Sequence, residues 1–245
     1  MSFIGEAPQG HRRVRGEGMN KTKIEWCDFT WNPIKGLCPV GCWYCYARKM
    51  YKRFKWDEKI DFLISEKDVI QMMIIEPARI FVCSTMEMFH PNIPSHLRDS
   101  IFYIIEKNPR HTFIILTKMP ENIDRPMPDN TWLGVSVTGV DGDDDRIRFL
   151  CNGTKPRVKF VSFEPLLGDL ATKGWNVFPD YVDALSWCIM GRLTGHGHVH
   201  DPTQANIKRI YQECRNAGIP VFLKDNLRGL WKGPFVQEFP METCT

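Results

Sequence analysis

The sequence predicts one α/β domain, built as a partial, TIM-like (β/α) barrel with six parallel strands and an additional terminal strand. The chain has 245 residues, a length that suits one α/β barrel or two small domains. With 43% hydrophobic and 25% charged residues its composition is globular, and no obvious linker divides it. Short apolar runs rich in Val, Ile and Phe alternate with helix-like stretches, which is typical of βα units and a parallel sheet. A doubly wound open sheet is the competing architecture.

The expected elements follow in order along the chain. Apolar runs predict strands at Arg79–Cys83, Thr112–Thr117, Trp132–Val137, Val158–Phe163, Leu185–Met190 and Pro220–Leu223. Amphipathic stretches predict helices at Glu66–Ile75, Pro94–Lys107, Asp143–Leu150 and Pro202–Ala217. For the last helix we expect Asp201 as the N-cap, Pro202 at the first helical position, and Gly218 at the end.

The two ends of the chain differ in character. Residues 1–18 lack periodicity and are expected to form a flexible extension, so that the barrel domain spans residues 19–245. The extension has no apolar core of the secretory type. No apolar stretch approaches the roughly 20 residues needed to cross a bilayer, so we expect a cytoplasmic protein without membrane contact. The net charge of +3 does not indicate nucleic-acid binding, although a local basic patch would allow it.

Three of the nine cysteines lie close together, at Cys38, Cys42 and Cys45, in the spacing C-x3-C-x2-C. An odd number of cysteines without an export signal argues against a disulfide scaffold. Buried structural thiols are a poor explanation, because Pro39 and Gly41 make this segment a loop. A structural zinc ion needs four ligands, and no second Cys/His pair stands at a recognisable spacing. A [4Fe–4S] cluster held by three thiolates is the third interpretation, and it leaves one iron open to a non-protein ligand.

The same motif, with the aromatic Tyr44 before its last cysteine, resembles the signature of radical S-adenosylmethionine (SAM) enzymes. In that superfamily the motif lies in the loop after the first barrel strand. The resemblance implies that the open iron chelates the amino and carboxylate groups of SAM. Reductive cleavage of SAM then yields a 5′-deoxyadenosyl radical that abstracts a hydrogen from the substrate. It also implies an electron donor such as flavodoxin or ferredoxin.

Further segments extend the resemblance from about Lys23 to Pro240. They are Lys23–Trp26, Phe29–Pro33, Leu116–Lys118, Trp132–Ser136, Ser162–Leu167 and Ile219–Lys224. These segments resemble a compact radical SAM family, many of whose members are phage-encoded and of unknown function. A related enzyme is the queuosine lyase, which releases queuine for salvage. The resemblance therefore implies a small, nucleoside-like substrate. A radical SAM enzyme that modifies nucleic acid, and a non-catalytic metal-binding module, are the alternatives.

Polar residues follow almost every predicted strand, where a barrel carries its active site. By analogy with the superfamily, the SAM amino group would be bound by Ser84, Thr85 or Glu87. The absence of a G-G-E motif leaves the choice among these three open. Ser136 and Thr138 would contact the ribose or the methionyl carboxylate, and adenine would lie against Met190, Gly191 and Tyr44. The remaining substrate-facing candidates are Asn32, Lys118, Glu164, Arg192, Lys224 and Asp225.

Among those candidates, Glu164, Asn32 and Lys118 are the expected catalytic residues. Glu164 would accept hydrogen bonds from a base, while Asn32 or Lys118 would hold the sugar or a phosphate. Trp31 either stacks on the substrate or belongs to the core. His196, His198 and His200 read as a metal-binding tract on composition, or as a flexible loop whose Asp201 caps the next helix.

Overall fold

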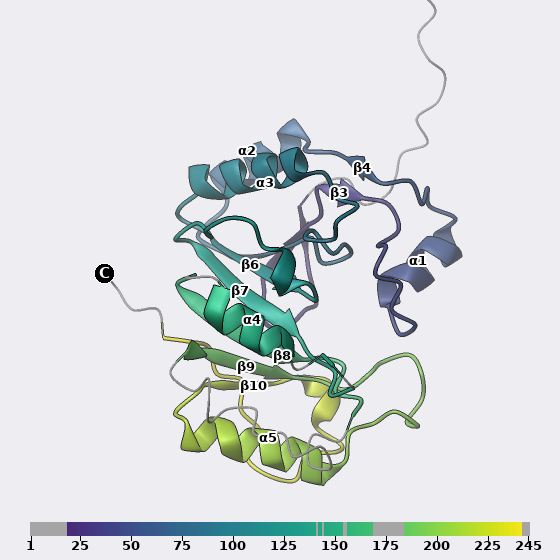
Figure 1. The fold of residues 1–245 in the computed structure, drawn as a ribbon, viewed down its shortest axis with the longest axis vertical. Coiled ribbons are helices and arrows are strands. Elements are labelled where there is room, and N and C mark those ends of the chain that lie inside the picture. The colour runs from purple at the N-terminus through teal and green to yellow at the C-terminus, as the bar shows by residue number, and fades with distance from the viewer. Residues whose placement is uncertain (1–18, 141, 144, 154–155, 169–183, 242–245) are drawn as a thin grey trace, which may run out of the picture.

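The fold is described from a computed structural model (Figure 1). It covers residues 19–140, 142–143, 145–153, 156–168 and 184–241. The predicted extension at residues 1–18 lies outside the described residues.

An eight-stranded sheet forms the centre of the molecule, in the order β1-β2-β5-β6-β7-β8-β9-β10. Its strands are β1 (Asn20–Lys21), β2 (Phe29–Trp31), β5 (Arg79–Val82), β6 (Thr112–Thr117), β7 (Thr131–Ser136), β8 (Val158–Phe163), β9 (Trp187–Met190) and β10 (Val221–Leu223). Only β1 runs antiparallel to its neighbour, and the other seven strands are parallel. All six strands predicted from apolar runs are present. A separate antiparallel pair, β3 (Ile34–Lys35) and β4 (Asp61–Phe62), flanks the sheet.

The order of the parallel strands in the sheet follows their order in the chain. A doubly wound sheet reverses direction at its middle, so this order excludes the competing architecture. The prediction of an α/β fold with a parallel sheet is confirmed. Among the described strands, β1 and β10 end the sheet without pairing with each other, and no closed barrel is formed.

Five α-helices accompany the described strands, namely α1 (Tyr46–Phe54), α2 (Glu66–Ile74), α3 (Ser95–Lys107), α4 (Asp145–Gly153) and α5 (Gln204–Asn216), with short 3-10 turns at Pro120–Asn122 and Asp225–Leu227. In the described part of the chain, no helix has the length and apolarity that a membrane span requires.

The cap predicted for α5 is wrong. Thr203 is the N-cap, and its hydroxyl accepts a hydrogen bond from the Asn206 N–H at 3.2 Å. Asp201 stands two residues before this cap, and its Oδ2 forms an ion pair with Arg192 at 2.9 Å. Gly218, with φ of +68°, follows the end of α5 as predicted.

The sheet buries both of its faces. One face packs Ile80, Ile115, Leu133 and their neighbours into a large aliphatic core with the helices. The opposite face, which we call the inner face, carries an aromatic core that includes Trp132, Phe160, Trp187 and Phe222. Side chains alternate between faces along a strand, so these aromatic residues share their face with residues two or four positions later, at or directly after the strand ends. The residues on the inner face at this end of the sheet are therefore Asn32, Lys118, Ser136, Glu164, Gly191 and Lys224.

Candidate functional site

The three clustered cysteines lie in the segment Gly36–Cys45, which we call the cysteine loop and which follows the first parallel strand. Its start is fixed by Gly36, whose N–H donates to the Tyr51 hydroxyl at 2.9 Å. A β-carbon on Gly36 would lie 2.5 Å from the Lys59 carbonyl oxygen, and its φ of +100° also favours glycine. At the far end of the loop, Cys45 is the N-cap of α1. The loop position matches the expectation drawn from the superfamily.

All three cysteines line one open hollow. Each is a free, half-buried thiol. Burial raises the pKa of the Cys38 thiol, although backbone N–H groups partly offset this. Arg48 closes one side of the hollow by donating from Nη2 to the Cys38 carbonyl at 3.0 Å.

The donor set of the cysteine loop suits an iron–sulfur cube better than a single ion. Among the described residues, no three His, Cys, Asp or Glu side chains converge on one point, as a zinc ion would require. A [4Fe–4S] cube binds each thiolate to a different iron, so its ligands surround a volume and do not meet at a point. Three thiols around one hollow fit that requirement.

The Tyr44 phenol of the cysteine loop lies within electrostatic range of the segment after β7 and of the first turn of α4. Burial and the neighbouring Cys42 thiol raise the pKa of Tyr44, and the charges of Arg146 and Asp143 act on its phenol. Arg146 donates to the Ser136 carbonyl at 2.7 Å, and Asp143 accepts from the Thr138 N–H and hydroxyl, both at 2.6 Å. Ser136 and Thr138 are thus held by residues of one segment, and Tyr44 lies within range of that segment's charges.

Asn32, directly after β2, connects that strand to the turn after β5. Its Oδ1 accepts hydrogen bonds from the Ser84 hydroxyl at 3.1 Å and from the Thr85 N–H at 3.3 Å. The Tyr46 hydroxyl donates to the Ser84 carbonyl at 2.9 Å, which connects the start of α1 to the same turn. Sequence reasoning missed Tyr46, although it stands next to the last cysteine of the motif.

Glu87 is buried, and both of its carboxylate oxygens accept hydrogen bonds within the protein. It accepts hydrogen bonds from the Thr117 hydroxyl and the Lys118 N–H, both at 2.7 Å, and from the Phe89 N–H at 3.2 Å. Burial nevertheless raises the pKa of its carboxyl group. This bonding makes Ser84 and Thr85 the more accessible of the three candidates for the SAM amino group, and the choice among them stays a prediction.

The Lys224 ammonium group lies between two carboxylates, those of Glu164 and Glu25, on the inner face. Lys224 Nζ donates to Glu164 Oε1 and lies 3.7 Å from Glu25 Oε2. Burial lowers the pKa of Lys224, but the two carboxylates outweigh burial and raise it overall. Gly191 leaves room for the pair, because a β-carbon there would lie 3.0 Å from Lys224 Cδ and 3.3 Å from Glu164 Cδ.

Glu25 was not among the residues expected from the sequence. Its other oxygen accepts from the Asp225 N–H at 2.7 Å, a contact across 200 residues. The only sequence signal for Glu25 is its place in the segment Lys23–Trp26, which carries part of the family resemblance but predicts no chemical role.

Several residues predicted to contact SAM or the substrate have other surroundings in the structure. Trp31 is 1% exposed on the helix-facing side of the sheet, with its ring 6.4 Å from Phe113, so it is a core residue and the stacking alternative is corrected. Met190 is also buried on that side. Asp225 binds Arg228 at the surface, and Arg192 binds Asp201.

The histidine-rich loop after β9 packs against the cysteine loop. The rings of His196 and His200 lie 5.4 Å and 4.9 Å from the exposed Trp43 ring. Lys49 of α1 donates to the Gly195 carbonyl at 3.0 Å. His198 contacts Asp201 at 2.7 Å. In the described part of the chain these three histidines do not form a metal site.

Comparisons with known proteins agree with this fold. A search of the curated proteins found no match to the chain. Among solved structures, the fold is similar to that of spore photoproduct lyase complexed with dinucleoside spore photoproduct, with a TM-score of 0.50 and 16% sequence identity. The similarity covers 82% of this chain but only 64% of the lyase chain. Residues 21–236 match the family described as "Protein of unknown function (DUF5131)". The chain therefore belongs to the DUF5131 family.

Proposed function

We propose that this protein is a radical SAM enzyme and that its open sheet is the wall of a partial barrel. The observation that carries the proposal is the C-x3-C-x2-C loop after the first parallel strand, with its three cysteines around one hollow. Spore photoproduct lyase, the solved structure of similar fold, is a radical SAM enzyme. The similarity in fold supports the proposal, while the chemistry rests on the cysteine loop.

Each group of residues has a distinct task in this proposal. Cys38, Cys42 and Cys45 would hold a [4Fe–4S] cluster, with Tyr44, Ser136 and Thr138 beside it to receive SAM. When bound, these two cofactors supply reductive cleavage of SAM and abstraction of a hydrogen atom from the substrate. Asn32 holds the turn at Ser84 and Thr85 in place. Glu164, oriented by Lys224, offers its second carboxylate oxygen to N–H donors on a substrate.

The proposal is tested by anaerobic reconstitution with iron and sulfide. We expect about four iron atoms per chain and formation of 5′-deoxyadenosine from SAM with dithionite as reductant. Cys42→Ala should lose both iron and SAM cleavage, because two thiolates are too few to hold the cube. Cys214→Ala, at a buried thiol packed in the helix-side core, is the matched control and should change neither. Full iron content and full cleavage in Cys42→Ala would contradict the assignment.

For the substrate we propose a nucleoside-like molecule, with queuosine as the first to be assayed. Glu164 on the inner face supports this, because its carboxylate can accept from the exocyclic amine and ring N–H of a 7-deazaguanine. Reduced enzyme incubated with SAM and queuosine should yield 5′-deoxyadenosine and free queuine, measured by mass spectrometry. Absence of queuine, with 5′-deoxyadenosine only at the background rate, would eliminate the lyase activity and leave the radical SAM proposal intact.

A radical SAM enzyme that modifies nucleic acid is the second candidate. Basic residues on α1 would attract the phosphates of such a substrate, but their position, described below, favours another partner. Binding of an oligonucleotide with a steep dependence on salt concentration would support this candidate over the lyase.

A further inference from the structure

Helix α1 carries a concentrated positive charge beside the cysteine loop. Five of the ten residues from Tyr46 to Lys55 are basic and none is acidic, in a chain whose net charge is +3. Lys52, Arg53 and Lys55 are exposed, and none of them forms a salt bridge with a carboxylate in the part of the chain that the structure describes. In Figure 1, α1 stands at the edge of the molecule, away from the helices that pack on the sheet.

The two sides of α1 face different surroundings. Ala47 and Tyr51, one turn apart, are buried and line the hollow with the three cysteines. Lys49, Lys52 and Arg53 have the i, i+3, i+4 spacing of a second face, and this face is exposed. We call Lys49, Lys52 and Arg53 the basic face. An α-helix with its side chains is about 10–12 Å across. A partner on the basic face would therefore lie about one helix diameter from the cysteine hollow.

We infer that the basic face of α1 is the docking site of a small acidic one-electron carrier protein, an inference that rests on the proposed function. Reductive cleavage of SAM consumes one electron per event, and that electron must come from outside the chain. The carrier would lose one electron to the cluster across α1, and no bond in this protein would form or break. Complementary charge steers such encounters and accelerates them.

The position of the basic face favours an electron carrier over a nucleic acid. A substrate must touch the reacting groups on the inner face, and α1 itself stands between the basic face and the cysteine hollow. An electron carrier, in contrast, needs only to bring its redox centre within tunnelling distance of the cluster. The exposed Phe54 ring, at 52%, lies under the Arg53 guanidinium, and exposed aromatic rings are common in protein interfaces.

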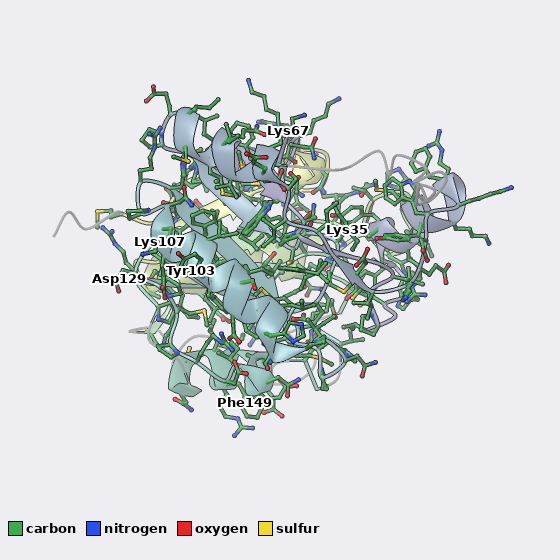
Figure 2. All side chains as sticks on the ribbon, turned by 90° about the horizontal axis from the view of Figure 1, so that it is seen from above. Lys35, Lys67, Tyr103, Lys107, Asp129 and Phe149 are labelled. Atoms are coloured by element: carbon green, nitrogen blue, oxygen red, sulfur yellow. The ribbon has the colours of Figure 1, made fainter. Side chains whose placement is uncertain are left out.

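The experiment compares two double variants that change the charge equally. Lys52→Glu/Arg53→Glu reverses the basic face. Lys67→Glu/Lys107→Glu is the control, since both lysines are exposed on α2 and α3, away from α1 in Figure 2. The probe is an acidic flavodoxin. Its oxidised form is titrated calorimetrically into each reconstituted protein, and its reduced form drives SAM cleavage beside a parallel assay with dithionite.

We expect the α1 variant to bind flavodoxin at least about tenfold more weakly at low salt, with the control within about twofold of the wild type. The difference should vanish at about 0.5 M salt, where charges are screened within a few ångströms. Cleavage driven by dithionite should be the same in all three proteins.

Equal flavodoxin binding by the wild type and the α1 variant would overturn the docking site alone. Loss of dithionite-driven cleavage in the α1 variant would also overturn it, because the basic face would then be needed for cleavage itself. Loss of oligonucleotide binding with flavodoxin binding unchanged would overturn it too, because the basic face would then bind the substrate. No SAM cleavage by the wild type with dithionite would overturn the proposed function and this inference together.

Discussion

At the scale of single residues, most polar groups at the strand ends bind one another. Asn32 holds the turn after β5, Glu87 holds the end of β6, and Lys224 holds Glu164. Such bonding satisfies polar groups that would otherwise be buried at a cost. It also means that only the remaining open atoms can meet a ligand. Glu164 Oε2, to which the described residues donate no hydrogen bond, is one of these, so its orientation by Lys224 matters for the proposed function.

Glu164→Gln should lower the pKa of Lys224, because it removes the closer of two carboxylates while burial, which disfavours the ammonium form, remains. At present the pKa lies above the usual value of 10.5, so the ion pair stabilises the fold below pH 10.5. That stabilisation is lost only as the pH rises through the folded-state value. NMR titration of lysine ε-carbons measures the change.

Glu25→Gln is the control for the Lys224 titration, and it should have a smaller effect because its carboxylate is 3.7 Å away. In the assay with substrate, Glu164→Gln should cut turnover strongly and leave iron content and SAM binding unchanged. A Lys224 pKa that does not move in Glu164→Gln would show that the pair does not form in solution.

At the scale of elements, the inner face is packed without spare volume where β7 meets β8. Every residue of β7 is buried. Gly134 stands opposite Phe160, and a β-carbon on Gly134 would lie 2.4 Å from the Phe160 ring. Interiors are close-packed, so neither strand can retreat without disturbing its other neighbour. Glycine at this position therefore serves the aromatic core and not a turn.

Gly134→Ala should destabilise the protein by about 1–3 kcal/mol, the usual cost of overpacking a core. Urea denaturation measures the loss. Combined with Phe160→Leu, which makes space at the same contact, the loss should be smaller than the sum of the two single changes. Gly229→Ala, with nothing within 4 Å of the added carbon, should change stability by less than about 0.5 kcal/mol. Strict additivity of the pair would refute the steric explanation.

At the scale of the whole molecule, the segment around Glu238 closes one side of the inner core. The Phe239 ring stacks on Trp187 at 5.5 Å, and the Trp187 indole N–H donates to the Glu238 carbonyl at 2.7 Å. The Glu238 carboxylate accepts two hydrogen bonds from Arg215 of α5, each at 2.8 Å, and one from the Val221 N–H of β10 at 3.1 Å. One carboxylate thus joins a helix, a strand and the C-terminal segment.

Glu238→Gln should lower the stability by roughly 0.5–1 kcal/mol at pH 7, the upper range for a partly exposed ion pair. Burial raises the pKa of Glu238, but Arg215 and the Val221 N–H outweigh it and lower it below 4.5. The stabilisation is therefore complete above pH 4.5 and is lost as the pH falls through the lowered value. Thermal unfolding at several pH values should show the two proteins converging in acid, while the exposed Glu106→Gln control follows the wild type throughout. A difference that persists unchanged in acid would contradict this account.

Much of the fold could be predicted because its signal is local. Apolar runs of four to six residues mark strands, and the six predicted runs all became neighbours in one sheet. Residue types at short spacing likewise identify the cysteine loop. The errors arose where a residue had a distant partner. Asp201 is the residue type of an N-cap and precedes Pro202, but α5 begins after Thr203, and Asp201 forms an ion pair with Arg192.

The sequence by itself determined the α/β pattern and the three cysteines after the first parallel strand, since periodicity and spacing are properties of a few consecutive residues. Only the tertiary structure decided which face each side chain occupies. Strand register put Trp31 in the helix-side core and Glu164 on the inner face. The tertiary structure also brings Glu25 to Lys224, and Lys49 to the Gly195 carbonyl. These partners are far apart in the chain, so no local sequence pattern predicts the contacts. The physical reason is that ion pairs and faces depend on how strands align, and alignment is settled by packing of the whole sheet.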